Sequence, residues 1–227
     1  MENTPRSDLL DYLAEANRNG TPIPTIAELS EELGMSITSL REQLEVARRL
    51  GFVTIKPKTG IQPCGFSLAP ALRLSLQYGT RVQPELFEAF RDLRKHIEAS
   101  YWFEAAPLLT SAEVSTLGDI VRKAQSKIKK QPIESPEKEH RAFHLAIFQH
   151  LENPVVKSLL ETYWDLNAGN ERNYYIDQNY LEIVWNYHQR IVEALAARDF
   201  ERGHQALLAH MDLVMQRKKA ELSQRFE

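Results

Sequence analysis

The chain has 227 residues, of which 43% are hydrophobic, and a formal net charge of −3, which suits one large globular domain or two small ones. This charge excludes a uniformly basic protein that coats nucleic acid, and no apolar run approaches the length of about 18 residues that a membrane-spanning helix needs. The polar start MENTPRSDLL predicts no signal peptide, and the single cysteine, Cys64, predicts a reduced, cytoplasmic setting.

The first predicted helix covers residues 7–18, with Leu10, Leu13 and Ala14 facing inward, and residues 19–22 break it. A second helix follows from Thr25, which can form a capping box with Glu28. Its apolar residues Ile26, Leu29 and Leu33 share one face, and Gly34 can adopt the positive φ that ends the helix and turns the chain.

Ser36 is positioned to cap a third helix. Leu40, Leu44 and Ala47 lie at i, i+4 and i+7 and should face inward. The opposite face carries four polar side chains: Thr38, Arg41, Glu45 and Arg48. This face is therefore the one that we expect to be available to a partner.

A β-hairpin should follow Gly51, because residues 52–56 alternate as strand residues do, residues 57–60 form a turn, and Ile61 begins the return strand. Two short helices, a tight turn and a hairpin are typical of a winged helix-turn-helix, which places one helix in the DNA major groove. Five basic and two acidic residues between Met35 and Lys58 give this region a local charge of +3. The alternative is a small helical pair with a hairpin that has no role in DNA binding.

Residues 67–78 predict a connecting helix that Pro70 interrupts early, and residues 79–84 form a boundary. From Glu85 onward the pattern is helical, with breaks at Pro107, at residues 129–136, at residues 152–154 and at residues 198–199. The predicted fold is mainly α, with a winged helix-turn-helix at residues 1–66, a connecting segment at 67–84 and an antiparallel helical bundle of six or seven helices at 85–227.

Four histidines of the bundle should converge. His140 and His144 are at i and i+4 on one helix. His188 precedes Asp199 by eleven residues and His210 follows it by eleven, so both come level if the chain reverses at Asp199. Four imidazoles at one level suit a divalent metal such as Zn²⁺ or Ni²⁺. The alternative is a set of buried neutral histidines that hydrogen bonds satisfy. We expect His96, His150 and His204 to be surface or helix-end residues.

The whole pattern resembles the GntR family of transcriptional regulators, in the FadR-type subgroup whose C-terminal ligand-binding domain is called FCD. In the N-terminal part the resemblance rests on Pro24, Glu28-Leu29, Gly34, Ser36, Thr38, Arg41-Glu42, Leu44, Gly51 and Gly60. In the bundle it rests on Arg94-x-x-x-Glu98, Phe143-His144, Asn153-Pro154, His188-x-x-Ile191, Asp199 and His210. The order and spacing of these residues together are specific.

The resemblance implies a metal site made by an Asp-x-x-x-His pair and one histidine on each of the last two helices. Here the three histidines are His144, His188 and His210, and His140 stands where the family has the aspartate. Replacing an anionic oxygen by a neutral nitrogen leaves about two positive charges on a bound divalent ion, which should attract an anionic effector more strongly.

The family also implies that Arg94 binds the carboxylate of an effector, since a guanidinium matches a carboxylate in a bidentate manner. An i, i+4 salt bridge with Glu98 on the helix surface is the equal alternative. We expect the nearby Tyr101, Trp102 and Phe103 to belong to the core rather than to a pocket.

The resemblance places DNA contacts on the third helix and the wing, although Ala27 and Ile37 replace two arginines that the family usually carries. The residues that we expect at the DNA are Ser36, Thr38, Ser39, Arg41, Arg48, Arg49, Lys56, Lys58 and Gly60. Arg41 would contact bases or position the helix in the DNA groove, and Lys56 and Lys58 would contact the DNA backbone.

The sequence therefore predicts a cytoplasmic, homodimeric regulator, a repressor by the commonest mode of the family, with activation as the alternative. It would bind a double-stranded DNA operator, and it would bind a small carboxylate effector at a metal-containing pocket. No membrane partner is predicted. A metal-dependent enzyme is the rival, but neither Glu137 nor Glu139 is obviously a general base beside the histidines, because Glu139 should point away from them. A DNA-binding architectural protein without an effector would leave the histidine spacing unexplained.

Overall fold

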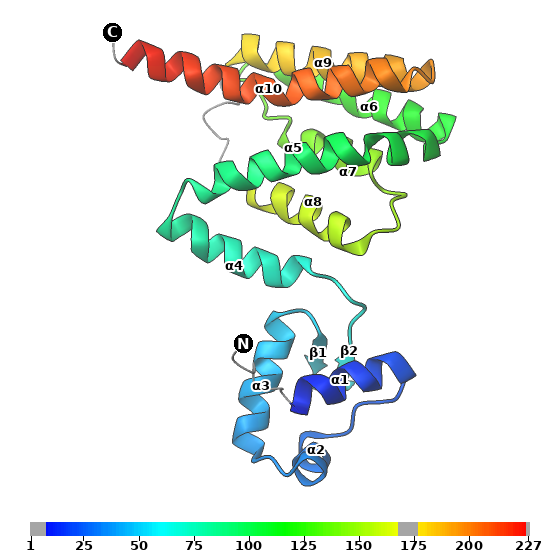
Figure 1. The fold of residues 1–227 in the computed structure, drawn as a ribbon, viewed down its shortest axis with the longest axis vertical. Coiled ribbons are helices and arrows are strands. Elements are labelled where there is room, and N and C mark those ends of the chain that lie inside the picture. The colour runs from blue at the N-terminus through cyan, green and yellow to red at the C-terminus, as the bar shows by residue number, and fades with distance from the viewer. Residues whose placement is uncertain (1–7, 168–176, 226–227) are drawn as a thin grey trace. The chain divides into compact units, whose positions relative to one another are not determined.

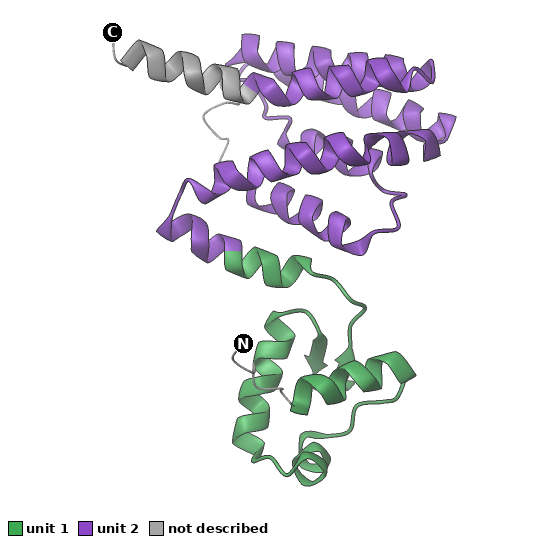
Figure 2. Ribbon diagram, in the orientation of Figure 1, with its two compact units in different colours: residues 1–75 green, residues 76–227 purple. Residues whose placement is uncertain are grey.

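The structure is a computed structural model that describes residues 8–167 and 177–225, with side chains described as far as Leu213. It confirms a mainly α fold with one small β-hairpin (Figure 1). The contacts divide the chain into two compact units, residues 1–75 and 76–227, and the division falls within the predicted connecting segment (Figure 2).

The first unit contains the first part of the connecting helix and, complete among its described residues, three helices and a two-stranded antiparallel sheet. They are α1 (Asp8–Asn19), α2 (Ile26–Leu33), α3 (Ile37–Arg49), β1 (Val53–Lys56) and β2 (Gly60–Pro63). The hairpin pairs Val53 with Pro63 and Lys56 with Gly60, and it has the turn that the sequence predicts. This is a winged helix-turn-helix.

Local capping explains both ends of α2 and the beginning of α3. Thr25 and Glu28 form both halves of the capping box, and Gly34 ends α2 at φ 64°. The Ser36 hydroxyl accepts a hydrogen bond from the Ser39 amide at 3.2 Å. These contacts, together with the burial of Leu40, Leu44 and Ala47, confirm the prediction for this region.

The inward face of α1 differs from the prediction. Leu9, Leu13 and Ala16 are the buried residues, whereas Leu10 and Ala14 are exposed. Leu9 at i, Leu13 at i+4 and Ala16 at i+7 form the helical stripe that packs against α3 and β2. The prediction was right for Leu13 and wrong for Leu10 and Ala14, in whose place Leu9 and Ala16 are buried.

The connecting helix α4 (Ala69–Val82) is longer than the sequence predicted. Pro70 does not interrupt it, because proline lacks only an amide that the first helical turn leaves unbonded. Gly79 and Thr80 continue the helix, and the Thr80 hydroxyl donates to the Leu76 carbonyl at 2.8 Å. The predicted boundary at residues 79–84 therefore begins only after Val82.

The second unit consists of helices, and four of the connections between them fall at the predicted breaks, whereas the division between Asn167 and Gln178 was not predicted. Its further elements are α5 (Leu86–Ala105), η1 (Ala106–Leu108), α6 (Ser111–Ile128), α7 (Glu137–Ile147), α8 (Pro154–Asn167), α9 (Gln178–Ala196) and α10 (Phe200–Arg225). Each break ends one helix and begins the next, which confirms the bundle. No described helix is both long enough and apolar enough to span a membrane.

The six long helices of this unit pack in a closed cycle. Helix α9 lies against α10 and α6, α7 lies against α6 and α8, and α5 completes the cycle between α8 and α10 (Figure 1). The main core contains large side chains from around the cycle, among them Trp102, Phe143 and Trp185. Polar side chains that point inward from α5, α7, α9 and α10 therefore meet in one enclosed region.

Candidate metal centre

The four predicted histidines come from three helices of the cycle. Helix α7 carries His140 and His144 one turn apart, α9 carries His188, and α10 carries His210. The reversal between α9 and α10 forms as expected: Arg198 adopts φ 54°, and the Asp199 carboxylate caps α10 by accepting from the Arg202 amide at 3.0 Å. The chain therefore turns where His188 and His210 are equally distant.

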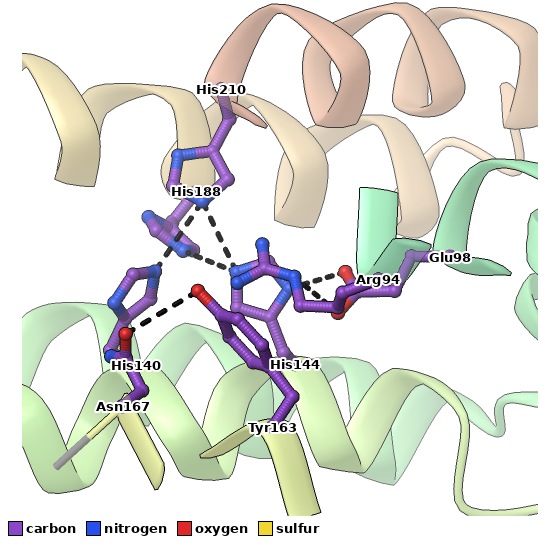
Figure 3. A network of polar contacts seen from close by, with 8 residues as sticks. All are labelled: Arg94, Glu98, His140, His144, Tyr163, Asn167, His188 and His210. Atoms are coloured by element: carbon purple, nitrogen blue, oxygen red, sulfur yellow. Dashed lines mark hydrogen bonds and ion pairs between the residues drawn. The ribbon is translucent and has the colours of Figure 1, made fainter. Parts of the chain in front are cut away.

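The structure brings the four imidazoles together (Figure 3). One ring nitrogen from each residue lies within 4.8 Å of all the others, and His144 and His188 have no solvent exposure. Nε2 of His144 lies 3.3 Å from Nε2 of His188 and 3.2 Å from Nε2 of His210, which is in turn 3.4 Å from Nε2 of His140. The four side chains thus direct the same nitrogen atom to a common point.

The outer nitrogens decide what these contacts can be. Nδ1 of His188 lies 2.8 Å from the Val184 carbonyl, an acceptor, so this nitrogen carries the ring proton. Nδ1 of His144 lies 2.8 Å from Oε2 of Glu98 and carries a proton for the same reason. In the neutral rings Nε2 of both residues then carries a lone pair instead of a proton. Because the two lone pairs repel each other, Nε2 atoms 3.3 Å apart need a cation between them.

A metal ion satisfies this arrangement better than a proton. A proton on Nε2 of His144 would serve one of its two contacts, whereas one ion accepts lone pairs from all four rings. Zinc–imidazole bonds of about 2.0–2.1 Å place tetrahedral ligand nitrogens about 3.3–3.4 Å apart. Three of the six separations between these nitrogens, at 3.2, 3.3 and 3.4 Å, fit that spacing, and all six lie within 4.8 Å. The donor set suits Zn²⁺ and Ni²⁺, and the residues therefore fit the group that the sequence predicts.

Electrostatics keeps the cluster ready for a cation. Burial is the largest cause that lowers the pKa of His140, His188 and His210 well below 6.5, and the positive charges of Arg94 and of any neighbouring imidazole that is protonated lower each pKa further. These rings are neutral at pH 7, as a metal ligand must be. Burial would raise the pKa of Glu98, but Arg94 and His144 outweigh it and hold this pKa below its usual value.

Arg94 lies beside this cluster rather than on the surface of the helix. Its Nε is 3.1 Å from Oε1 of Glu98, and both side chains are buried. The guanidinium stands over the rings of Tyr163 and Trp164, with its carbon 4.5 and 4.9 Å from their centroids. The i, i+4 pair of the second alternative thus exists, but its expected exposed position was wrong.

Sequence reasoning placed Arg94 of α5 at the site, but it missed the contact of Glu98 with His144 and the contribution of α8. The bond between Glu98 and His144 joins residues 46 positions apart, and no periodicity in the sequence indicates it. The ring of Trp164 lies 4.7 Å from that of His140 and 4.9 Å from that of His144. The only available signal was the pair Arg94 and Glu98, whose second partner was not foreseen.

The other polar residues lie as follows. His96 and His150 are exposed, and His204 is half-buried against the ring of Phe103. Trp102 belongs to the core as predicted, but Phe103 is 48% exposed, so its assignment to the core was wrong. Glu139 points to α6, where its carboxylate pairs with Lys127 at 2.9 Å and with Lys123 at 3.1 Å. It therefore points away from the imidazoles, as expected.

The predicted DNA-contacting residues share the outer side of α3 and the hairpin. Thr38, Arg41 and the wing residues Lys56, Lys58 and Gly60 are exposed. Ser36 is occupied as the cap of α3, and Ser39 is half-buried. An unforeseen feature is Glu45, which holds Arg48 through two hydrogen bonds of 2.7 and 2.6 Å and Arg49 through one of 2.9 Å.

Comparison with known proteins decides the family. The model of the FCD domain matches residues 88–213. The chain belongs to the FCD-containing branch of the GntR family of transcriptional regulators. This GntR-family chain is 25% identical over 200 residues to the HTH-type transcriptional regulator LutR of Bacillus subtilis, covering 85% of the chain and 89% of LutR. It is 28% identical over 177 residues to the HTH-type transcriptional regulator McbR of Escherichia coli, covering 76% and 72% of the two chains.

A solved structure supports the same fold. Streptococcus agalactiae GntR aligns with a TM-score of 0.63 at 18% identity, covering 91% of this chain and 96% of that one. The named relatives are transcriptional regulators, so this GntR-family protein is a regulator rather than an enzyme. The interpretation of the histidine cluster as a catalytic centre is therefore abandoned.

Proposed function

We propose that this GntR-family regulator acts in the cytoplasm as a homodimer. Each protomer contributes one winged helix to a half-site of a pseudo-palindromic operator, and a small carboxylate effector that binds at the metal and Arg94 controls operator affinity. The observation that carries the proposal is the convergence of four Nε2 atoms beside a buried guanidinium.

His140, His144, His188 and His210 would hold the divalent ion. When bound, the ion would attract a carboxylate through its positive charge, which the neutral imidazole ligands do not compensate. A bound ion would link α7, α9 and α10, because each of these helices contributes at least one histidine. Arg94 adds a second cation from α5, held over the rings of Tyr163 and Trp164.

An effector at this site can act on DNA only if it binds two arrangements of the dimer with different affinities. The histidines and Arg94 belong to different helices of the cycle, so an anion that contacts both favours one packing of those helices. A packing change in the bundle would alter the separation of the two winged units. Release of the operator on effector binding, which is repression relieved by the effector, is the mode that we propose.

On the DNA side, Arg41 would contact the groove, and Lys56 and Lys58 would contact the backbone. The support is their exposure on α3 and on the hairpin. Arg48 and Arg49 are also placed on α3, although Glu45 must share or release them when phosphate approaches.

The first test is the metal content of the purified protein. We expect about one Zn²⁺ or Ni²⁺ per chain in the wild type and in His204→Ala, and loss of the metal in His188→Ala. His204 is a matched control because it is a histidine of α10 that lies outside the cluster. Metal-free wild-type protein that takes up neither ion at micromolar concentration would contradict the metal proposal.

The second test measures binding to operator DNA by fluorescence anisotropy while small carboxylates are added. The expected result is a carboxylate that shifts the affinity of the wild type but not that of Arg94→Gln. If Arg94→Gln responds as the wild type does, Arg94 is not an effector ligand.

A further inference from the structure

Glu98 joins the two halves of the proposed site. Its carboxylate is buried with no solvent exposure, and its two oxygens face two different partners (Figure 3). Oε2 lies 2.8 Å from Nδ1 of His144, and Oε1 lies 3.1 Å from Nε of Arg94. The same side chain therefore contacts a proposed metal ligand and the proposed effector ligand.

We propose that Glu98 is a positioning residue that fixes the tautomer of His144 for metal binding and orients Arg94 for the anion. This inference rests on the proposed function. It assigns to Glu98 a specific task, which is to keep the proton of His144 on Nδ1 so that Nε2 keeps its lone pair.

The chemistry of the two partners explains why a carboxylate is needed. An ionised carboxylate only accepts hydrogen bonds, so it can take the proton of His144 and the positive charge of Arg94 at the same time. Such outer partners set ring orientation and raise the basicity of a ligating imidazole. In His188 the Val184 carbonyl has this role, because it accepts the Nδ1 proton at 2.8 Å. Glu98 is thus the equivalent of that carbonyl for His144.

A glutamine at this position should reverse the tautomer. The positive charge of Arg94 attracts the amide oxygen, so the amide NH₂ faces Nδ1 of His144. That NH₂ is a donor, and it requires a lone pair on Nδ1, which moves the ring proton to Nε2. An Nε2–H cannot ligate a metal, and the proton would point at the Nε2 atoms of His188 and His210.

The test combines Zn²⁺ affinity, measured by competition with a chromophoric chelator, and the tautomers of His144 and His188, measured by ¹⁵N NMR of the metal-free protein. For Glu98→Gln we expect a roughly 10- to 100-fold loss of Zn²⁺ affinity and a shift of the His144 proton from Nδ1 to Nε2. The tautomer of His188 should not change, which makes it an internal control.

Glu139→Gln is the matched control variant. Glu139 is also a buried, ion-paired glutamate, and it lies on the helix that carries His144, but its partners are Lys127 and Lys123. We expect its Zn²⁺ affinity and its tautomers to match those of the wild type. If Glu98 had a merely structural role, Glu98→Gln would lower stability and leave the tautomer of His144 unchanged.

Glu98→Asp separates contact from charge, and it also serves if Glu98→Gln does not fold. It keeps the negative charge but withdraws the carboxylate from His144 by one methylene, so we expect weaker Zn²⁺ binding here as well. Equal Zn²⁺ affinity in the wild type and in the Glu98 variants would overturn this inference while leaving the metal site intact. An affinity loss with an unchanged His144 tautomer would also overturn it. A wild type that binds no Zn²⁺ would instead overturn the proposed function, and this inference with it.

Discussion

Acidification should unfold the metal-free protein more readily, because three buried imidazoles must stay neutral in the folded chain. The pKa values of His140, His188 and His210 are all held well below 6.5, first by burial. The unfolded chain restores ordinary values, so below about pH 6.5 the unfolded state binds more protons than the folded state. Stability is therefore complete above this pH and is lost progressively as the pH falls through it.

The size of the effect follows from the number of rings. Between about pH 7.5 and about pH 5.5, each histidine that protonates only in the unfolded state costs about 1.4 kcal/mol of stability. Three such rings give a loss of up to about 4 kcal/mol, which is a large part of the roughly 5–15 kcal/mol that a domain has in total. Carboxyl groups titrate mostly below this range and add little to the change.

The assay is urea unfolding of the full chain in the presence of a chelator at the two pH values. Circular dichroism monitors the loss of helix. His96→Ala is the control variant, since it removes an exposed histidine that lies outside the cluster. Saturating Zn²⁺ should raise stability at the higher pH, by about 2.7 kcal/mol at 100 times Kd. A loss below about 1 kcal/mol between the two pH values would refute the reasoning from buried neutral imidazoles.

Three further outcomes concern the winged unit. Gly51→Ala should destabilise it by about 1–3 kcal/mol, because Gly51 has φ 81° and an added Cβ would lie 2.6 Å from Cγ of Pro70; thermal unfolding should show no such loss for Gly65→Ala, where the Cβ meets nothing within 4 Å. Thr25→Ala should cost about 1 kcal/mol in the same assay, since it removes half of the capping box. Arg41→Ala should weaken operator binding by about 1–3 kcal/mol if the side chain reads a base, or reduce the salt dependence by about one ion if it contacts phosphate; unchanged anisotropy titrations would exclude both roles.

Local sequence signals determined most of the fold. Thr25, Gly34 and Ser36 act on their own neighbours within a few residues, so their capping and turning roles could be predicted without tertiary structure. The convergence of the histidines could also be foreseen, because helix geometry has a fixed rise per residue and Asp199 marks the reversal. In the short helix α1, periodicity identified Leu13 but selected Leu10 in place of Leu9.

Tertiary structure alone decided how the histidines are supported. Glu98 meets His144 across 46 residues of sequence, and the aromatic rings of α8 reach Arg94 from a different helix. A sequence pattern reports which face of a helix is apolar, but it does not report which helix covers that face. The burial of Arg94 and Glu98 and the tautomer of His144 depend on that choice of neighbours. The sequence by itself therefore determined which residues could ligate a metal. The packing of six helices around one point decided which ring nitrogen carries the proton and which residue accepts it.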